Sequence, residues 1–173
     1  MTFNDIKVIA MPGNTIDFKV DNRSASNVAR TIKAGEPVVE CTNYVGRIVD
    51  DDVGAVTDKL YGIAAEESTE TSALNGTCAV TMILPMATIL RGNAKTTASA
   101  NTAALLLALL NDDFPFSASY TPYDTTNEGV ITIDEATDDG TNHGLRCIGG
   151  SGDAFATLDV IVKPQWLAAG AAA

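Results

Sequence analysis

The sequence contains few of the residues that most catalytic and nucleic-acid-binding sites require. Its 173 residues include one histidine, His143, and 11 Lys and Arg against 22 Asp and Glu, which gives a net charge of −11. A general base needs a positioned partner and a cleft, whereas His143 lies in the Gly-rich polar stretch "DDGTNHG". A surface with this charge balance repels phosphates. We therefore expect neither an enzyme nor a protein that binds nucleic acid directly.

Cysteines and long apolar runs are also scarce. Cys41, Cys78 and Cys147 are widely spaced and form no CxxC, which argues against a disulfide framework and a structural zinc site. Three free thiols fit a protein made in a reducing cytoplasm. The longest apolar run, residues 103–110, would span about 12 Å as a helix, far less than a ~30 Å hydrocarbon core. We expect no membrane segment.

Motifs for phosphate or metal chemistry are missing as well. The sequence has no GxxxxGK[ST] and no HExxH. The acidic runs "DDD" (50–52) and "DEATDD" (134–139) contain hard oxygen ligands of the kind that Ca²⁺ prefers. Their spacing is not that of an EF-hand, and acidic runs of this kind are typical of solvated hairpin tips. We expect no cofactor and no metal.

What the sequence does contain is a strong β-strand signal. Short runs that are β-branched or alternate with period two are separated by turn residues such as Pro12-Gly13, Ala34-Gly35 and Asn75-Gly76. Many short strands with frequent turns are typical of a barrel or sandwich. We therefore predict an all-β fold, a barrel or sandwich of short strands, with one short helical insertion. The expected strands are 15–20, 37–42, 44–49, 59–65, 77–84, 88–90, 130–134, 145–148 and 157–163.

The exception is the segment 95–129, which we interpret as the helical insertion. Ala and Leu are strong helix formers, so the run "AALLLALL" predicts a helix near 101–111 with Ser99 or Asn101 as its N-cap. The helix is apolar all round, which indicates that it is covered on several sides. Residues 111–129 carry four of the Phe and Tyr residues and are predicted to form a long ordered loop that these rings anchor.

These segments suggest a simple domain organisation. Residues 1–30 form an N-terminal arm and the first strands, residues 31–166 form one β-rich domain that includes the insertion at about 95–129, and residues 167–173 form a flexible tail. The tail, "LAAGAAA", offers too little side chain to pack.

Several turn-and-strand motifs resemble those of the head decoration proteins of tailed bacteriophages. They are the turn Ala34-Gly35 followed by Pro37 and Val38, the strand "YGIA" (61–64), the pair Gly76 and Val80, and the close Gly92 and Ala94. Residues 145–164 look like the closing strand pair of such a domain. The resemblance covers about half of the chain and does not include the helical insertion.

The resemblance implies a structural virion protein on the outer surface of the capsid, made in the host cytoplasm. Such a protein binds the assembled major capsid protein and stabilises the shell, as a trimer at three-fold or quasi-three-fold positions. Two alternatives remain: another virion part, such as a head fibre base, neck or tail-tube subunit, or a β-sandwich module that binds a ligand or carbohydrate.

The sequence also suggests where partners bind. Aromatic and apolar side chains are enriched at interfaces, and we expect the segment 103–123 to pack between subunits or onto the shell. A core role for Leu105 to Leu110 is the alternative. Residues 1–30 are expected to help dock the shell. The candidate interface residues are Leu106, Leu110, Phe114, Phe116, Tyr120 and Tyr123.

Overall fold

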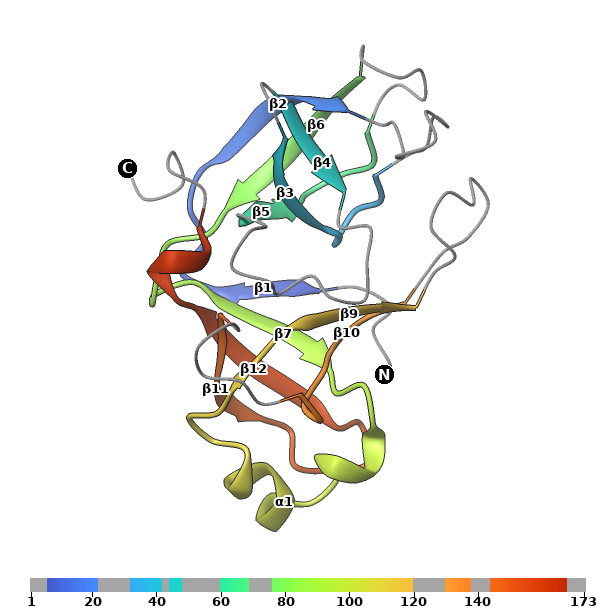
Figure 1. The fold of residues 1–173 in the computed structure, drawn as a ribbon, viewed down its shortest axis with the longest axis vertical. Helices are drawn as coiled ribbons and strands as arrows, with labels where there is room; N and C mark the ends of the chain where they lie inside the picture. The colour runs from blue at the N-terminus through green and yellow to red at the C-terminus, as the bar shows by residue number, and fades with distance from the viewer. Residues whose placement is uncertain are drawn as a thin grey trace.

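The computed structural model describes residues 6–21, 32–41, 44–47, 60–68, 76–119, 130–137 and 144–167. These residues form mostly antiparallel β-structure with one short α-helix, so the predicted fold class is confirmed. Figure 1 shows two stacked parts, which we call the barrel lobe, at the top of the view, and the sheet lobe below it. The helix α1 lies at the far end of the sheet lobe (Figure 1).

The sheet lobe is built on a five-stranded antiparallel sheet with the order β1-β7-β12-β11-β8. A separate two-stranded sheet, β9-β10, packs beside β7. The lobe therefore draws its strands from both ends of the chain. Their bounds are β1 (Lys7–Ala10), β7 (Ile89–Asn93), β8 (Asp113–Phe114), β9 (Phe116–Ser119), β10 (Val130–Ile133), β11 (Leu145–Gly150) and β12 (Thr157–Val162).

The barrel lobe contains five strands whose hydrogen-bonded ladders close on themselves in the order β2-β4-β3-β5-β6. Four of the five pairings are antiparallel. The parallel pairing of β2 with β4 completes the ring through two residue pairs, Val20 with Val45 and Asp21 with Gly46. The strands are β2 (Thr15–Asp21), β3 (Pro37–Cys41), β4 (Tyr44–Arg47), β5 (Leu60–Ala64) and β6 (Gly76–Met82).

Apolar side chains form two adjoining core clusters. The larger cluster contains the fully buried rings of Phe114 and Phe116 and reaches into the barrel lobe through residues such as Ile63. A smaller cluster lies inside the barrel lobe, and Phe18 and Tyr61 pack against both clusters, with their ring centroids 5.2 Å apart. The two lobes are therefore not separated by solvent where these side chains meet.

The helical insertion is shorter and less covered than predicted. α1 spans Ala103–Ala108 and follows a 3₁₀ turn, η1, at Thr97–Ser99. Its N-cap is Thr102, whose hydroxyl accepts a hydrogen bond from the Leu105 amide, so neither predicted cap is used. No α1 residue is buried, because the sheet lobe covers only one side of the helix. The helical segment ends where Asn111 adopts the left-handed conformation, which asparagine tolerates.

Three strands were not predicted. β1 is only four residues long, and β8 and β9 fall in the segment that we interpreted as a loop. At the C-terminal end, the 3₁₀ turn η2 (Pro164–Trp166) returns the chain to β5, where Leu167 forms a bridge with Leu60 and is buried. Leu167 therefore belongs to the body and not to a tail. Residues 168–173 lie outside the described residues.

Candidate functional site

Large apolar side chains of the described residues are exposed in two sets, which we define by their places in the chain. The first set, which we call the crossover patch, lies on β1, on β2 and on the two connections between the lobes. The second set, which we call the helix tip, lies on α1, on β11 and on the loop between β11 and β12. The crossover patch comprises Ile9, Met11, Ile16 and Met86, and the helix tip comprises Leu105, Leu107, Ile148 and Phe155.

The crossover patch is formed by two connections between the lobes. Met11 lies between β1 and β2, and Met86 lies between β6 and β7. The buried hydroxyl of Thr88 joins these connections, because it donates to the Met11 carbonyl at 2.6 Å and accepts from the Leu84 amide at 2.8 Å. The Met86 amide donates to the carbonyl of Val162 at 2.9 Å. Both connections are therefore fixed to the body by hydrogen bonds, two of which involve the buried Thr88.

Both methionines have an unusual backbone conformation. Met11 has φ 48° and Met86 has φ 55°, in the left-handed region that side chains other than Gly and Asn rarely adopt. Their side chains are 62% and 47% exposed. Ile16, on β2, is exposed, whereas Phe18, two residues along the same strand, packs against the core. The patch thus combines backbone strain with exposed, adaptable side chains.

α1 packs closely against the sheet lobe beside two glycines. An added Cβ at Gly150 would lie 3.0 Å from Leu106 Cδ1, and one at Gly152 would lie 3.2 Å from Ala103 Cα. These glycines therefore allow α1 to approach β11 and the loop that follows it closely. Leu107, which is 68% exposed, and Phe155, which is 54% exposed, are the most exposed members of the tip.

The predicted interface residues divide between core and surface. Phe114 and Phe116 are fully buried in the core of this chain, so neither ring is exposed to contact a partner. Leu106 and Leu110 are half-buried and pack against the same core, while Tyr120 and Tyr123 lie outside the described residues. In the described part of the predicted segment, the exposed large apolar side chains are instead Leu105 and Leu107.

The acidic and basic side chains of the sheet lobe form internal contacts. The buried carboxylate of Asp113 accepts from Arg146 Nε and Nη2, both at 3.0 Å, and from Lys163 Nζ at 2.9 Å. Burial by itself would raise the pKa of Asp113, but the hydrogen bonds from Arg146 and Lys163 outweigh it and hold that pKa below its usual value. This cluster joins β8, β11 and the end of β12, and its role is structural.

Part of the acidic run 134–139 is also used internally. The Asp134 carboxylate pairs with Lys95 Nζ at 2.7 Å, and the Glu135 carboxylate accepts from the backbone amides of Lys95 and Thr96. These carboxylates fix the chain after β7 to the end of β10. Residues 50–52, 138–139 and His143 lie outside the described residues. In the described part of the chain, no cluster of three side chains could hold a metal ion, and no helix is long and apolar enough to span a membrane.

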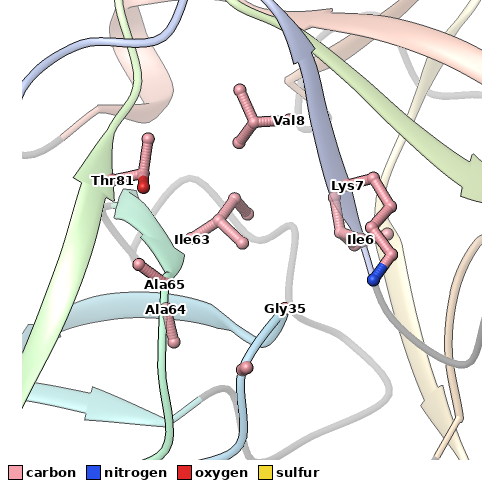
Figure 2. A pocket seen from close by; sticks show the side chains of 9 residues that line it. Ile6, Lys7, Val8, Gly35, Ile63, Ala64, Ala65 and Thr81 are labelled. Atoms are coloured by element: carbon pink, nitrogen blue, oxygen red, sulfur yellow. The ribbon is translucent and has the colours of Figure 1, made fainter.

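A small hollow lies between β1 and the barrel lobe. Figure 2 shows Ile6, Lys7 and Val8 on one side, with Ile63, Ala64 and Ala65 on the other. Its volume of about 290 Å³ falls just below the usual range for ligand pockets. The hydrogen bond from the Ile6 amide to the Gly35 carbonyl, 3.1 Å long, joins the lobes beside it. The lining is mostly apolar and brings together no group of polar side chains that would orient a ligand.

No family model matches the chain, and neither the curated proteins nor the solved structures include a significant match. The candidate site therefore depends on the geometry of this molecule. Sequence reasoning missed the crossover patch entirely. The sequence signal that points to this patch is a pair of turns that contain proline, at Pro12-Gly13 and Pro85-Met86. Each turn is flanked by large apolar residues.

Proposed function

We propose that this protein is a non-enzymatic structural component of a tailed-phage virion that binds the outer surface of the assembled capsid and stabilises it. It acts as a trimer at three-fold or quasi-three-fold positions and contacts the major capsid protein through the crossover patch. The resemblance of the turn-and-strand motifs supports the class of protein. The crossover patch is the observation that carries the docking role.

The patch has the properties of a surface prepared for a protein partner. Exposed apolar groups that gather in one place are typical of interaction sites, and methionine side chains adapt to irregular surfaces. A left-handed backbone at two non-glycine residues costs of order 1–3 kcal/mol each and persists where the surroundings enforce it. Here Thr88 and Val162 supply those constraints. The patch is therefore ordered before it meets a partner, which reduces the entropy lost on binding.

A carbohydrate-binding module is less well supported. Such a module presents several aromatic side chains on one face. Among the aromatic side chains that the structure describes, only Phe155 is exposed. The exposed apolar surfaces fit a protein that binds a capsid lattice better than one that binds a carbohydrate. On a lattice many weak contacts act together, and binding at several points raises the overall affinity without any new contact.

The test is binding to empty, expanded shells assembled from the major capsid protein of the same phage. We expect the wild-type protein to cosediment with these shells and to raise their melting temperature. The double variant Met11→Asn/Met86→Asn should bind at least tenfold more weakly, because it removes the apolar surface while asparagine keeps the left-handed backbone.

The control is Ala136→Asn, which places the same polar side chain at an exposed turn residue outside both patches. It should bind like the wild type. If the wild-type protein fails to bind shells, the proposed function is wrong. If the double variant binds as well as the control, the protein docks through another surface.

A further inference from the structure

The exposed sulfur-bearing side chains of the described residues belong to the crossover patch. Met11 is 62% exposed and Met86 is 47% exposed, whereas Met82 is only 7% exposed. Cys78 and Cys147 are fully buried. Among the sulfur-bearing side chains whose exposure the structure describes, the two methionines of the patch are therefore the ones that a dissolved reagent reaches.

We infer that Met11 and Met86 are a site of oxidative modification, where a peroxide converts them to methionine sulfoxide and so releases the protein from its partner. With hydrogen peroxide, the thioether sulfur attacks one oxygen, a sulfur–oxygen bond forms and the oxygen–oxygen bond breaks. The sulfur loses an electron pair to the peroxide, and the second oxygen takes the proton of the first and leaves as water. The release from a partner rests on the proposed function, whereas the site of oxidation does not.

The exposure of both thioethers is a property of the folded backbone. The Thr88 hydroxyl donates to the Met11 carbonyl at 2.6 Å, and the Met86 amide donates to the Val162 carbonyl at 2.9 Å. These hydrogen bonds fix the chain at both residues, which also hold a strained left-handed conformation of the kind found at functional sites. A peroxide can therefore react with both thioethers in the native state, without local unfolding.

The other described sulfur atoms are protected in two ways. The thioether of Met82 belongs to the larger core cluster, so the core has to open before a peroxide reaches it. A cysteine reacts as the thiolate, and burial raises the pKa of Cys78 to about 11 and also raises the pKa of Cys147. A thioether needs no deprotonation. At neutral pH, the fold therefore directs oxidation to the crossover patch.

Oxidation would reverse the character of the patch. A sulfoxide is polar, and its oxygen is a hydrogen-bond acceptor that an apolar partner surface leaves unsatisfied. The adaptable apolar side chains that favour docking are lost at both positions. The change is reversible, because two classes of reductase each act on one epimer of the sulfoxide. The patch thus has the chemistry of a redox switch on an interaction surface.

The first test maps the oxidation in the Cys41→Ser background with hydrogen peroxide at neutral pH, followed by peptide mass spectrometry. We expect Met11 and Met86 to be oxidised roughly tenfold faster than Met82, with an unchanged circular dichroism spectrum. The matched control is the same chain unfolded in urea, in which all three methionines should react at similar rates. If Met82 reacts as fast as the other two in the folded protein, the inference is wrong.

The second test measures binding of the oxidised protein to empty, expanded shells. Oxidised protein should bind roughly tenfold more weakly than untreated protein, and treatment with both reductases should restore binding. The matched variant is Met11→Leu/Met86→Leu, because leucine is apolar and, like methionine, unbranched at Cβ. Peroxide should leave the binding of this variant unchanged. If it loses binding as the wild type does, the damage lies elsewhere and the inference is overturned.

The two tests separate this inference from the proposed function. If the untreated wild-type protein does not bind shells, the proposed function is wrong, and the oxidation map still decides whether the crossover patch is the site of modification. If the untreated protein binds shells and the oxidised protein binds them equally well, the proposed function stands and the release by oxidation is refuted.

Discussion

The sheet lobe and the barrel lobe are both built from short strands, but different interactions hold them together. The sheet lobe encloses large side chains such as Phe114, Phe116 and Leu145, and a buried carboxylate with two cationic partners ties its edge strand to its neighbours. The small cluster inside the barrel lobe includes Ala64, Cys78 and Val80. There the strands are held mainly by backbone ladders that close into a ring.

This difference shows how two ways of building β-structure coexist in one chain. A sheet that buries large side chains gains most of its stability from apolar area removed from water, at roughly 25 cal/mol per Å². A small closed ring has less room for side chains, and it gains from leaving few unpaired strand edges. Because Phe18 and Tyr61 contact both interiors, the two lobes should nevertheless unfold together. The following predictions test the comparison, from the largest expected effect to the smallest.

Truncating one core residue in each lobe should reveal the largest difference. We expect Phe116→Ala to lower the free energy of unfolding by about 3–5 kcal/mol, because it leaves a large cavity in the sheet lobe. In the barrel lobe, Val80→Ala removes fewer buried atoms and should cost about 2 kcal/mol. Urea denaturation followed by circular dichroism measures both values. Equal losses in the two variants, or two separate transitions in the wild type, would contradict this account.

Disrupting the ion cluster around Asp113 should produce the second-largest loss of stability. Asp113→Ala removes the carboxylate that faces the buried Lys163, and we expect a loss of about 3 kcal/mol, since Arg146 is partly exposed and can turn to water. In the barrel lobe, the pair between Lys33 and Glu67 is exposed, so Glu67→Gln should change stability by less than about 1 kcal/mol.

The Asp113 cluster also predicts how stability depends on pH. The folded pKa of Asp113 lies below its unfolded value of about 3.9. Its contribution is therefore fully present above that unfolded value and is lost as the pH falls through the lower folded pKa. Wild type should lose stability in this acidic range more steeply than Asp113→Ala. Parallel pH profiles for the two proteins would show that the cluster contributes nothing.

Close backbone approaches provide a third, smaller contrast. An added Cβ at Gly62 in the barrel lobe would lie 2.2 Å from the Thr81 carbonyl oxygen, so the backbone would have to shift. We expect Gly62→Ala to cost about 1–3 kcal/mol, as other overpacking substitutions do. Gly149→Ala in the sheet lobe is the control, because the nearest atoms to its added Cβ are 3.9 Å away. If thermal denaturation shows equal effects, the ladder of the barrel lobe is more adaptable than its geometry indicates.

The sequence predicted best those elements whose signal is local. The strands at 15–20, 37–42 and 157–163 alternate or are β-branched, and the structure has strands at each place. β8 and β9 fall within 111–129, which we predicted to be a long ordered loop because it carries two prolines and four Phe and Tyr residues. In β8 the buried Asp113 carboxylate is paired with Arg146 and Lys163, which come from distant parts of the chain. No local pattern contains that information.

The candidate surfaces were predictable only in part. The Ala/Leu run indicated that the helix is an unusual apolar element, but its uniform apolarity predicted coverage, and the structure leaves Leu105 and Leu107 exposed. Phe114 and Phe116 have the composition of interface residues, yet the core contains them. Exposure is decided by which elements meet in the fold. The crossover patch forms where hydrogen bonds of Thr88 join two connections between the lobes. The sequence alone does not reveal this long-range contact.

The smallest effect concerns two buried thiols, one in each lobe. Burial, together with the nearby carboxylates of Glu66, Glu36 and Asp17, raises the pKa of Cys78 in the barrel lobe to about 11. Burial is also the main reason why the pKa of Cys147 in the sheet lobe is raised. At pH 8 both thiols are therefore protonated and shielded, and neither should react within minutes with a disulfide reagent such as dithionitrobenzoate.

A Cys41→Ser background leaves only these two thiols and turns them into reporters of local opening. Because the barrel ring is closed by only two residue pairs between β2 and β4, we expect local opening, at urea concentrations below the unfolding transition, to label Cys78 faster than Cys147. Mass spectrometry of the labelled protein measures this order. Immediate labelling of Cys78 without urea would contradict its burial. Simultaneous labelling of both thiols would mean that the barrel lobe opens only when the sheet lobe does. In that case the contacts that Phe18 and Tyr61 make with both clusters would control opening, and the different construction of the two lobes would not.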